Sequence, residues 1–497
     1  MRLFNHQRRQ GSDAVRTDAA KNDERAALAF RERIRRARPK ERYSEMTYEA
    51  LKSRIRGTLI TAFDLGYAET CDALIWNGRK PARRATAIVR AACVKDVQAA
   101  VRYAALHGLS VSARGSGHHF TGIAARADIV IDLAALDGMK IDASTRTARL
   151  EPAVTNKRLA NALERQGLAF PVGHCGSVSI SGYLLGGGVG WNSGAWGIAC
   201  FSVFAVEVVM ADGRLITASA DTHAEVFWAA RGAGPGFFGI VTAYHVALQE
   251  APGASTTQVR VYPAQSLPDV ADWAERVVAM APPNVEFTVK IDQSPNGPVL
   301  AAIANVFAAS EVEAADIIAQ LSEGAPEDVL SVIGPIPTPI PALYESTGPS
   351  TPEAHRFGVD TFWSEAPLAD VLAPLTHALG AAPQSKSFAV VTLRSNALPV
   401  PRDAAFSCAG RVFATLYGVW EDEADDDANL AWLRATSGRC RGMATGRYVG
   451  EADLDNPAAN ARTLSDEAAA RLAELQTRYD PEGVFLKRSF APAFAAA

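Results

Sequence analysis

The feature that most constrains this chain is a long uncharged stretch, residues 166–206. It contains no Asp, Glu, Lys or Arg, and its middle, residues 173–190, reads GHCGSVSISGYLLGGGVG. Such a backbone is either buried or wrapped around a large ligand. Glycine has no Cβ, so its backbone can approach a ligand closely, and consecutive N–H groups in such a loop bind phosphates. The stretch therefore predicts a cofactor-binding loop that carries one thiol, Cys175.

Three other interpretations compete with a cofactor loop. A membrane span is disfavoured because Ser177, Ser179, Asn192 and the glycines interrupt the apolar residues. A buried turn without a ligand stays an alternative for any glycine-rich loop. A Cys175 nucleophile with His174 as its base is disfavoured because adjacent residues of an extended chain point to opposite faces.

The whole chain is that of a globular protein with room for two domains. It has 497 residues, of which 48% are hydrophobic and 21% charged, with a formal net charge of −4. Because there is no basic excess, the expected partner is a small molecule and not nucleic acid or a membrane. Six cysteines without the short spacing of zinc ligands indicate reduced thiols and no metal site. The sequence carries no signal for an oligomeric state.

The two most highly charged segments are assigned no chemistry. Residues 1–49 are expected to be a charged N-terminal extension, in which acidic residues interrupt the basic ones of 33–42. Its first ten residues, MRLFNHQRRQ, lack the apolar segment of a secretory signal, so a cytoplasmic location is expected. The acidic run 421–427 predicts a solvated loop or helix start, because consecutive carboxylates cannot all converge on one metal ion.

Periodicity predicts a β-α-β pattern in the first part of the chain. Residues 87–92 read as a strand, 94–106 as an amphipathic helix and 109–114 as a second strand. The loop GSGHHFTG, 115–122, follows, and then another buried strand, 129–133. A Rossmann dinucleotide site is excluded because its glycine motif opens a helix, whereas a strand follows this loop.

The later elements fall into two groups on either side of a change in composition near residues 249–253. Before it we predict a strand at 149–153, a helix at 156–166, a hairpin over 203–218 with an Asp-Gly turn, a helix at 224–230, a glycine cluster at 231–239 and a strand at 240–248. After it we predict strands at 257–262, 285–291, 299–305, 387–394 and 411–420, and helices at 267–280 and 311–321.

Four separated motifs carry a family resemblance. The first, RGSGHHFTG at 114–122, is similar to an Arg-x-Gly-Gly-His loop with Ser116 in place of a glycine. The others are GHCGSV at 173–178, the glycine cluster at 231–239, with Phe where Asn is usual, and the closing helix with its Tyr-Asp-Pro turn at 471–485. Together they resemble the FAD-binding oxidoreductases of the berberine bridge enzyme-like group, in the vanillyl-alcohol oxidase/p-cresol methylhydroxylase-type superfamily.

The resemblance implies FAD that is covalently attached twice. It places His118 at the position that bonds the flavin 8α-methyl and Cys175 at the position that bonds flavin C6, with His119 as the nearest rival to His118. An imidazole nitrogen and a thiolate can add to activated flavin carbons, and two bonds fix the ring and raise its potential. The cofactor-binding residues expected from these motifs are Arg114, Gly115, Ser116, Gly117, His118, His119, Gly122, Cys175, Gly176, Ser177, Val178, Gly182, Gly186, Gly187, Gly188, Gly190, Gly239, Ile240 and Val241.

The resemblance also implies an activity. Hydride would pass to flavin N5 from an alcohol or activated C–H of a sugar, phenolic or secondary metabolite, and O2 would reoxidise the flavin to give H2O2. The run YVGEAD at 448–453 is similar to the family's Tyr-x-Asn-Tyr-x-Asp, with Gly450 and Glu451 as replacements. Glu451 or Tyr448 is the candidate base, since burial raises the pKa of a carboxylate. Phe120 stands where tyrosine is frequent in the family.

We therefore expect an α+β protein with a two-part FAD-binding domain of the vanillyl-alcohol oxidase type, residues 50–250 and 441–497. A substrate domain, 251–440, would be inserted, built on a mixed or antiparallel sheet covered by helices. An oxidase is favoured over a dehydrogenase with another electron acceptor. A non-catalytic small-molecule binding protein and a thiol hydrolase are the alternatives from other classes, and neither would have a chromophore.

Overall fold

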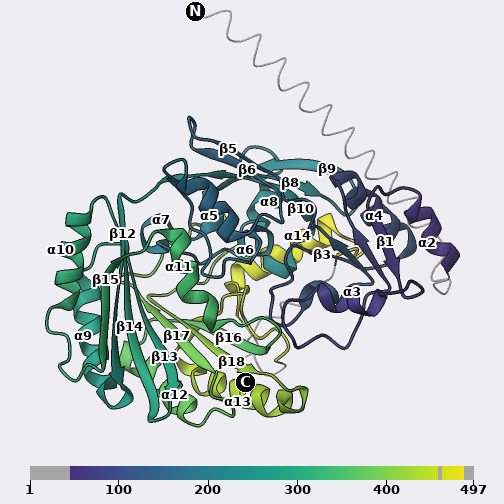
Figure 1. The fold of residues 1–497 in the computed structure, drawn as a ribbon. Helices are drawn as coiled ribbons and strands as arrows, with labels where there is room; N and C mark the ends of the chain where they lie inside the picture. Colours follow the sequence, from purple (N-terminus) through teal and green to yellow (C-terminus); the bar gives the residue numbers. More distant parts are fainter. Residues whose placement is uncertain (1–44, 457–461, 486–497) are drawn as a thin grey trace, which may run out of the picture.

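The computed structural model describes residues 45–456 and 462–485 (Figure 1). The predicted charged extension lies outside the described residues except for its end, where helix α2 (Glu45–Lys52) begins. Helices and sheets are mixed along the chain, which confirms the α+β fold class. Within the described ranges, no helix combines the length and the apolar character needed to cross a membrane.

The first sheet contains the predicted β-α-β pattern. Its order is β1-β2-β4-β3, formed by β1 (Thr58–Thr61), β2 (Ala87–Arg90), β4 (Ile129–Asp132) and β3 (Val111–Arg114). Strands β2 and β3 both pair in parallel with β4, and helix α4 (Val94–His107) crosses between them. The apolar residues of α4 are buried at helical spacing, as the periodicity predicts. The glycine-histidine loop, residues 115–122, therefore begins at the carboxyl end of strand β3.

The second sheet is antiparallel and contains the predicted hairpin. Its order is β5-β6-β10-β8-β9, formed by β5 (Met139–Asp142), β6 (Thr147–Leu150), β10 (Ile240–Ala247), β8 (Val203–Val209) and β9 (Leu215–Ser219). A small pair, β7 (Leu168–Ala169) and β11 (Gln249–Glu250), lies beside it. Strand β5 is absent from the prediction because its four residues alternate between half-buried and exposed and carry two charges.

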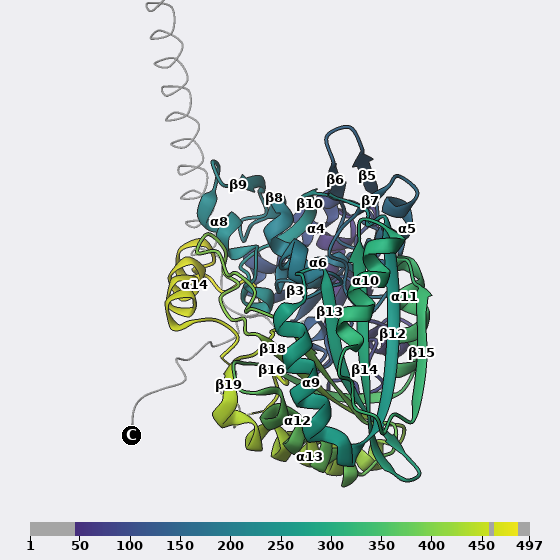
Figure 2. The same ribbon diagram turned by 90° about the vertical axis from the view of Figure 1, so that its left-hand side faces the viewer.

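The third sheet is large and antiparallel in every pairing (Figure 2). Its strands, in sheet order, are β15 (Ser331–Pro337), β12 (Ala254–Pro263), β14 (Gly297–Ala308), β13 (Val285–Ser294), β17 (Phe388–Leu393), β18 (Val412–Trp420), β16 (Arg356–Ser364) and β19 (Ala444–Gly446). The helices that pack on it are α9 (Leu267–Met280), α10 (Glu311–Ser322), α12 (Leu368–Gly380) and α13 (Asp426–Arg439). They cover one face, and the other face is left for the cavity described below.

Several elements after residue 330 were missed from the sequence. Strand β16 contains Gly358 and the buried Asp360, which interrupt a strand pattern, and Asp360 is paired with Arg447. Helix α12 contains Pro374, which normally ends a helix. Strand β15 and helix α11 (Ile340–Thr347) were missed too. The acidic run is confirmed as a loop that leads into a helix, because α13 begins at Asp426.

The C-terminal helix α14 (Asp466–Tyr479) packs beside α8 (Ala224–Ala229), far away in sequence (Figure 2). Arg478 contacts Glu225 at 2.6 Å, and Tyr479 stacks on Phe238. One hydrophobic core combines residues from 48–248 with residues of α14 and the following turn, and a second core lies between the large sheet and its helices. The domain limits drawn from the sequence stay predictions. The remaining helices are α3 (Tyr67–Ala73), α5 (Asn156–Glu164), α6 (Ile180–Leu185) and α7 (Ser193–Trp196).

Candidate functional site

One large cavity lies between the glycine-rich loops and the large sheet. Its volume is about 820 Å³, in the upper part of the range for small-molecule sites. The loop after β3, the segment 173–191 and the start of β10 form one wall. Strands β12, β13, β14, β17 and β18 and the segment 448–451 form the other. The uncharged stretch 166–206 therefore forms much of the first wall.

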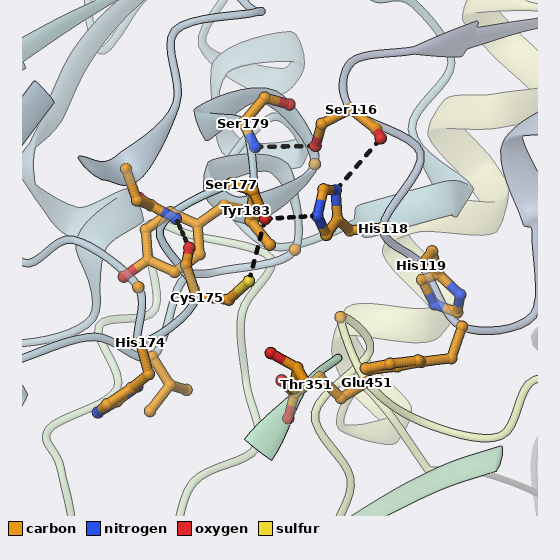
Figure 3. A pocket seen from close by; sticks show the side chains of 18 of the residues that line it. Ser116, His118, His119, His174, Cys175, Ser177, Ser179, Tyr183, Thr351 and Glu451 are labelled. Carbon is orange, nitrogen blue, oxygen red and sulfur yellow. Dashed lines mark hydrogen bonds between the residues drawn. The ribbon is translucent and has the colours of Figure 1, made fainter. Parts of the chain in front are cut away.

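His118 reaches this cavity from the end of β3 and is held at both ring nitrogens (Figure 3). Its Nδ1 lies 3.2 Å from the carbonyl oxygen of Ser116, and its Nε2 lies 2.8 Å from Oγ of Ser177. The ring stacks on Trp76 with centroids 5.2 Å apart. Removal from bulk water lowers the pKa of His118 to about 4, although the hydrogen bond to Ser116 opposes this. The imidazole is therefore neutral at neutral pH.

Cys175 lies close to His118 and belongs to the second glycine-rich loop, residues 173–178. Its Sγ lies 3.4 Å from Oγ of Ser177, so the two residues predicted to bond the flavin share one hydrogen-bond partner. The carbonyl of Cys175 accepts a hydrogen bond from Nδ2 of Asn156, which anchors the loop. A second link joins the two loops, because the backbone N–H of Ser179 donates to Oγ of Ser116 at 2.9 Å.

His119 points away from Ser177, the residue that both His118 and Cys175 contact (Figure 3). Its Nε2 lies 3.0 Å from the carbonyl of Val449, and its Nδ1 lies 3.0 Å from Oγ1 of Thr121. It therefore ties its own loop to the segment before Glu451. Of the two adjacent histidines, His118 is the one beside Cys175.

Most of the cofactor-binding residues predicted from the motifs line the cavity. Those that do are Gly115, Ser116, Gly117, His118, His119, Cys175, Gly176, Ser177, Val178, Gly182, Gly186, Gly239, Ile240 and Val241. Those outside its lining are Arg114, Gly122, Gly187, Gly188 and Gly190.

These five outer residues hold the loops in shape. The guanidinium of Arg114 donates to the carbonyl of Leu74 and contacts Asp132. Gly187 and Gly188 have φ of +120° and +90°, which side chains rarely adopt. Gly122 starts a short turn, and Gly190 pairs with the backbone of Gly173.

Gly182 provides a test of whether the cavity fits a flavin. A Cβ built at Gly182 would meet no atom within 4 Å, although its neighbours Tyr183 and Leu184 are buried. The space beside this backbone is therefore open to a ligand. The cavity is large, and its wall is open at Gly182. The neutral imidazole of His118 and the thiol of Cys175 lie close together in it, and this combination fits FAD. The described residues contain no group of three or more His, Cys, Asp or Glu that could hold a metal ion.

The two candidate bases have different surroundings. Glu451 lines the cavity and accepts a hydrogen bond from the Tyr417 hydroxyl at 3.4 Å. Burial raises the pKa of Glu451, while His174, Tyr417 and Thr415 partly oppose the shift. Tyr448 is buried, and burial raises its phenol pKa well beyond neutral pH. The surroundings therefore favour Glu451 as a base over Tyr448.

Glu286 is a cavity residue that was not predicted from the sequence, and its partner is His174, for which no role was predicted. Nε2 of His174 lies 2.9 Å from Oε1 of Glu286, and Trp191 packs edge-on against the imidazole. A signal was present in β13, where Glu286, Thr288 and Lys290 alternate with apolar residues and all line the cavity. Such alternation predicts one apolar face and one that meets solvent or a ligand.

Comparisons with known proteins point to the same cofactor. The family described as FAD binding domain matches residues 85–219. FAD-linked oxidoreductase janO of Penicillium janthinellum is 26% identical over 417 residues, which cover 82% of this chain and 91% of that protein. The chain contains an FAD-binding domain, is similar over most of its length to FAD-linked oxidoreductases, and has the berberine bridge enzyme-like fold.

Two further proteins are similar to this chain. (R)-6-hydroxynicotine oxidase of Paenarthrobacter nicotinovorans is 36% identical over 199 residues, 40% of this chain and 43% of that protein. The berberine bridge enzyme-like protein 1 of Physcomitrella patens superposes with a TM-score of 0.78, at 18% identity, over 90% of this chain and all of that one. The resemblance drawn from four motifs is thereby confirmed, as are the enzyme class and FAD as the cofactor.

Proposed function

We propose that this FAD-linked oxidoreductase is an oxidase whose flavin is bonded to both His118 and Cys175. Its substrate would be a sugar, phenolic or secondary metabolite that is oxidised at an alcohol or activated C–H. O2 would be the electron acceptor and H2O2 the second product. One observation carries the proposal: the imidazole of His118 and the thiol of Cys175 meet at Ser177 in the wall of one cavity.

The cavity residues would have separate roles in the reaction. Bound FAD would supply the hydride acceptor of the reaction. Glu451 would take the proton that leaves the substrate oxygen or nitrogen as the hydride leaves carbon, since its half-buried side chain lines the same cavity. The aromatic side chains of Phe388 and Phe413 on the large sheet line the space in which an apolar part of the substrate would lie.

The double attachment is tested by precipitating the protein with acid. A yellow pellet is expected, because covalent flavin stays with the protein whereas bound flavin dissolves. Cys175→Ala and His118→Ala should each keep one bond, and mass spectrometry of the flavin peptides should assign it. A colourless wild-type pellet would refute covalent attachment.

The electron acceptor needs a separate measurement. An oxidase consumes O2 and releases H2O2 in equal amounts with the oxidised substrate, so an oxygen electrode combined with a peroxidase assay measures both. Substrates can be screened anaerobically by bleaching of the flavin absorbance, which does not depend on the acceptor. If a substrate bleaches the flavin but O2 restores the colour only slowly, the enzyme is a dehydrogenase and the oxidase proposal fails.

A further inference from the structure

The hydroxyl of Ser177 lies between the two side chains that we propose to bond the flavin. It is 2.8 Å from Nε2 of His118 and 3.4 Å from Sγ of Cys175 (Figure 3). Nε2 and Sγ are therefore no farther apart than the sum of these two lengths. No other described residue forms hydrogen bonds with both side chains in this structure.

The direction of each hydrogen bond follows from the groups involved. The carbonyl of Ser116 can only accept, so Nδ1 of the neutral His118 carries the ring hydrogen and Nε2 offers a lone pair. The single hydrogen of the Ser177 hydroxyl then points to Nε2. Oγ of Ser177 is left to accept from the Cys175 thiol, which gives a directed chain from S–H through O–H to nitrogen.

We propose that Ser177 is a positioning residue for flavin attachment, which holds the Cys175 thiol and the His118 imidazole so that both reach one edge of the ring. The inference rests on the proposed function. Each attachment replaces one C–H bond of the flavin and one S–H or N–H bond of the protein by a C–S or C–N bond. The two electrons and two protons released pass to O2, the acceptor already named, and form H2O2.

Ser116 supports the same arrangement from the other loop. Its carbonyl fixes the His118 tautomer, and its hydroxyl accepts the backbone N–H of Ser179, two residues after Ser177. The histidine loop and the cysteine loop are thereby joined at two points that follow the thiol, Ser177 and Ser179. The serine that replaces a glycine in the first motif thus has a structural use in this chain.

Ser177→Thr and Ser177→Val form a matched pair for the test, since the two new side chains have nearly the same shape and only Thr keeps the hydroxyl. Full-length protein is purified from riboflavin-limited cells and mixed with FAD, and acid-stable flavin is followed with time. Mass spectrometry then quantifies flavin on the His118 and Cys175 peptides. Ser144→Ala, on the exposed turn between β5 and β6, is the control.

We expect each of the two bonds to form about tenfold more slowly in Ser177→Val, because His118 and Cys175 each lose their hydrogen bond to Ser177, which contributes about 1.4 kcal/mol. Ser177→Thr and Ser144→Ala should match the wild type. If Ser177→Val forms both bonds at the wild-type rate, or loses only one of them, the inference is wrong while the double attachment stands. If the wild type forms no acid-stable flavin, the proposed attachment itself fails.

Discussion

Nε2 of His174 lies 2.9 Å from Oε1 of Glu286 and so joins the cysteine loop to strand β13 on the opposite wall of the cavity. The imidazole is 38% exposed, toward the cavity, whereas the Glu286 side chain is only 6% exposed. Arg394 follows Leu393, the residue that pairs with Phe287 on the neighbouring strand β17, and burial lowers the pKa of its guanidinium to about 10 while Glu286 opposes the shift. Glu286 thus interacts with the buried Arg394 as well as with His174.

Replacing Glu286 by Ala should lower the stability of the fold. The change removes a buried carboxylate and leaves Arg394 with less compensation for its buried charge, which should cost about 3 kcal/mol. Urea unfolding followed by fluorescence measures the loss. Glu250→Ala is the control, because Glu250 forms an ion pair with Arg146 but is 79% exposed, and it should cost less than about 1 kcal/mol. Equal losses in the two variants would contradict a structural role for the pair.

Adding a methyl group at Gly182 should reduce flavin content without harming the fold. The new Cβ would enter the open space beside the first wall, and Ala should raise helix stability by about 0.5–1 kcal/mol over Gly. Gly438→Ala is the matched control, since Gly438 also lies in a helix and its Cβ would meet no atom. The ratio of flavin to protein absorbance should fall only in Gly182→Ala. Full flavin occupancy there would show that the cofactor lies elsewhere.

Glu451→Gln should slow anaerobic flavin reduction about 100-fold or more, because the amide cannot accept the substrate proton. In the wild type, the reduction rate should rise with pH as Glu451 ionises. This rise, the acidic limb of the pH profile, should lie above pH 4.5, since burial raises the pKa of Glu451 from that value. The same shift works against stability, because the folded state disfavours the ionised form. Above the raised pKa, Glu451→Gln should therefore be more stable than the wild type.

Tyr417→Phe provides the companion measurement. The Tyr417 hydroxyl donates to Glu451 and lowers its pKa, so removing the hydroxyl should move the acidic limb of the reduction rate to higher pH. Stopped-flow reduction over a pH series measures the limb. If Glu451→Gln keeps both the wild-type rate and the limb, another group is the base.

Asp480→Ala should weaken the turn that follows α14. Its two carboxylate oxygens accept the backbone N–H groups of Val484 and Phe485 at 2.7 and 3.0 Å. Hydrogen bonds to a charged group contribute roughly 1.5–3 kcal/mol, so the variant should lose about 2 kcal/mol. Phe485 lines the cavity, and flavin content should fall as well. The exposed Glu474→Ala on the same helix should change neither quantity, and a similar loss there would rule out the turn as the cause.

Local patterns identified much of the fold. The apolar spacing of α4 and α9, the Asp-Gly turn between β8 and β9 and the glycine-rich loops are features of neighbouring residues, so the sequence displays them directly. Elements that depend on distant partners were harder to predict. Strand β16 is interrupted by Asp360, which is stable in a sheet because Arg447, far along the chain, pairs with it.

The candidate site likewise has local features, which the sequence predicts, and features that depend on contacts between distant residues. The sequence alone determined that a thiol and a histidine occur in glycine-rich loops, because loop composition and residue type are local properties. Only the tertiary structure decided that His118 and not His119 meets Cys175, since that choice depends on Ser116, Ser177 and the contact of His119 with Val449. It also decided that Glu286 faces His174, because the packing of the large sheet against the cysteine loop brings together residues more than a hundred positions apart.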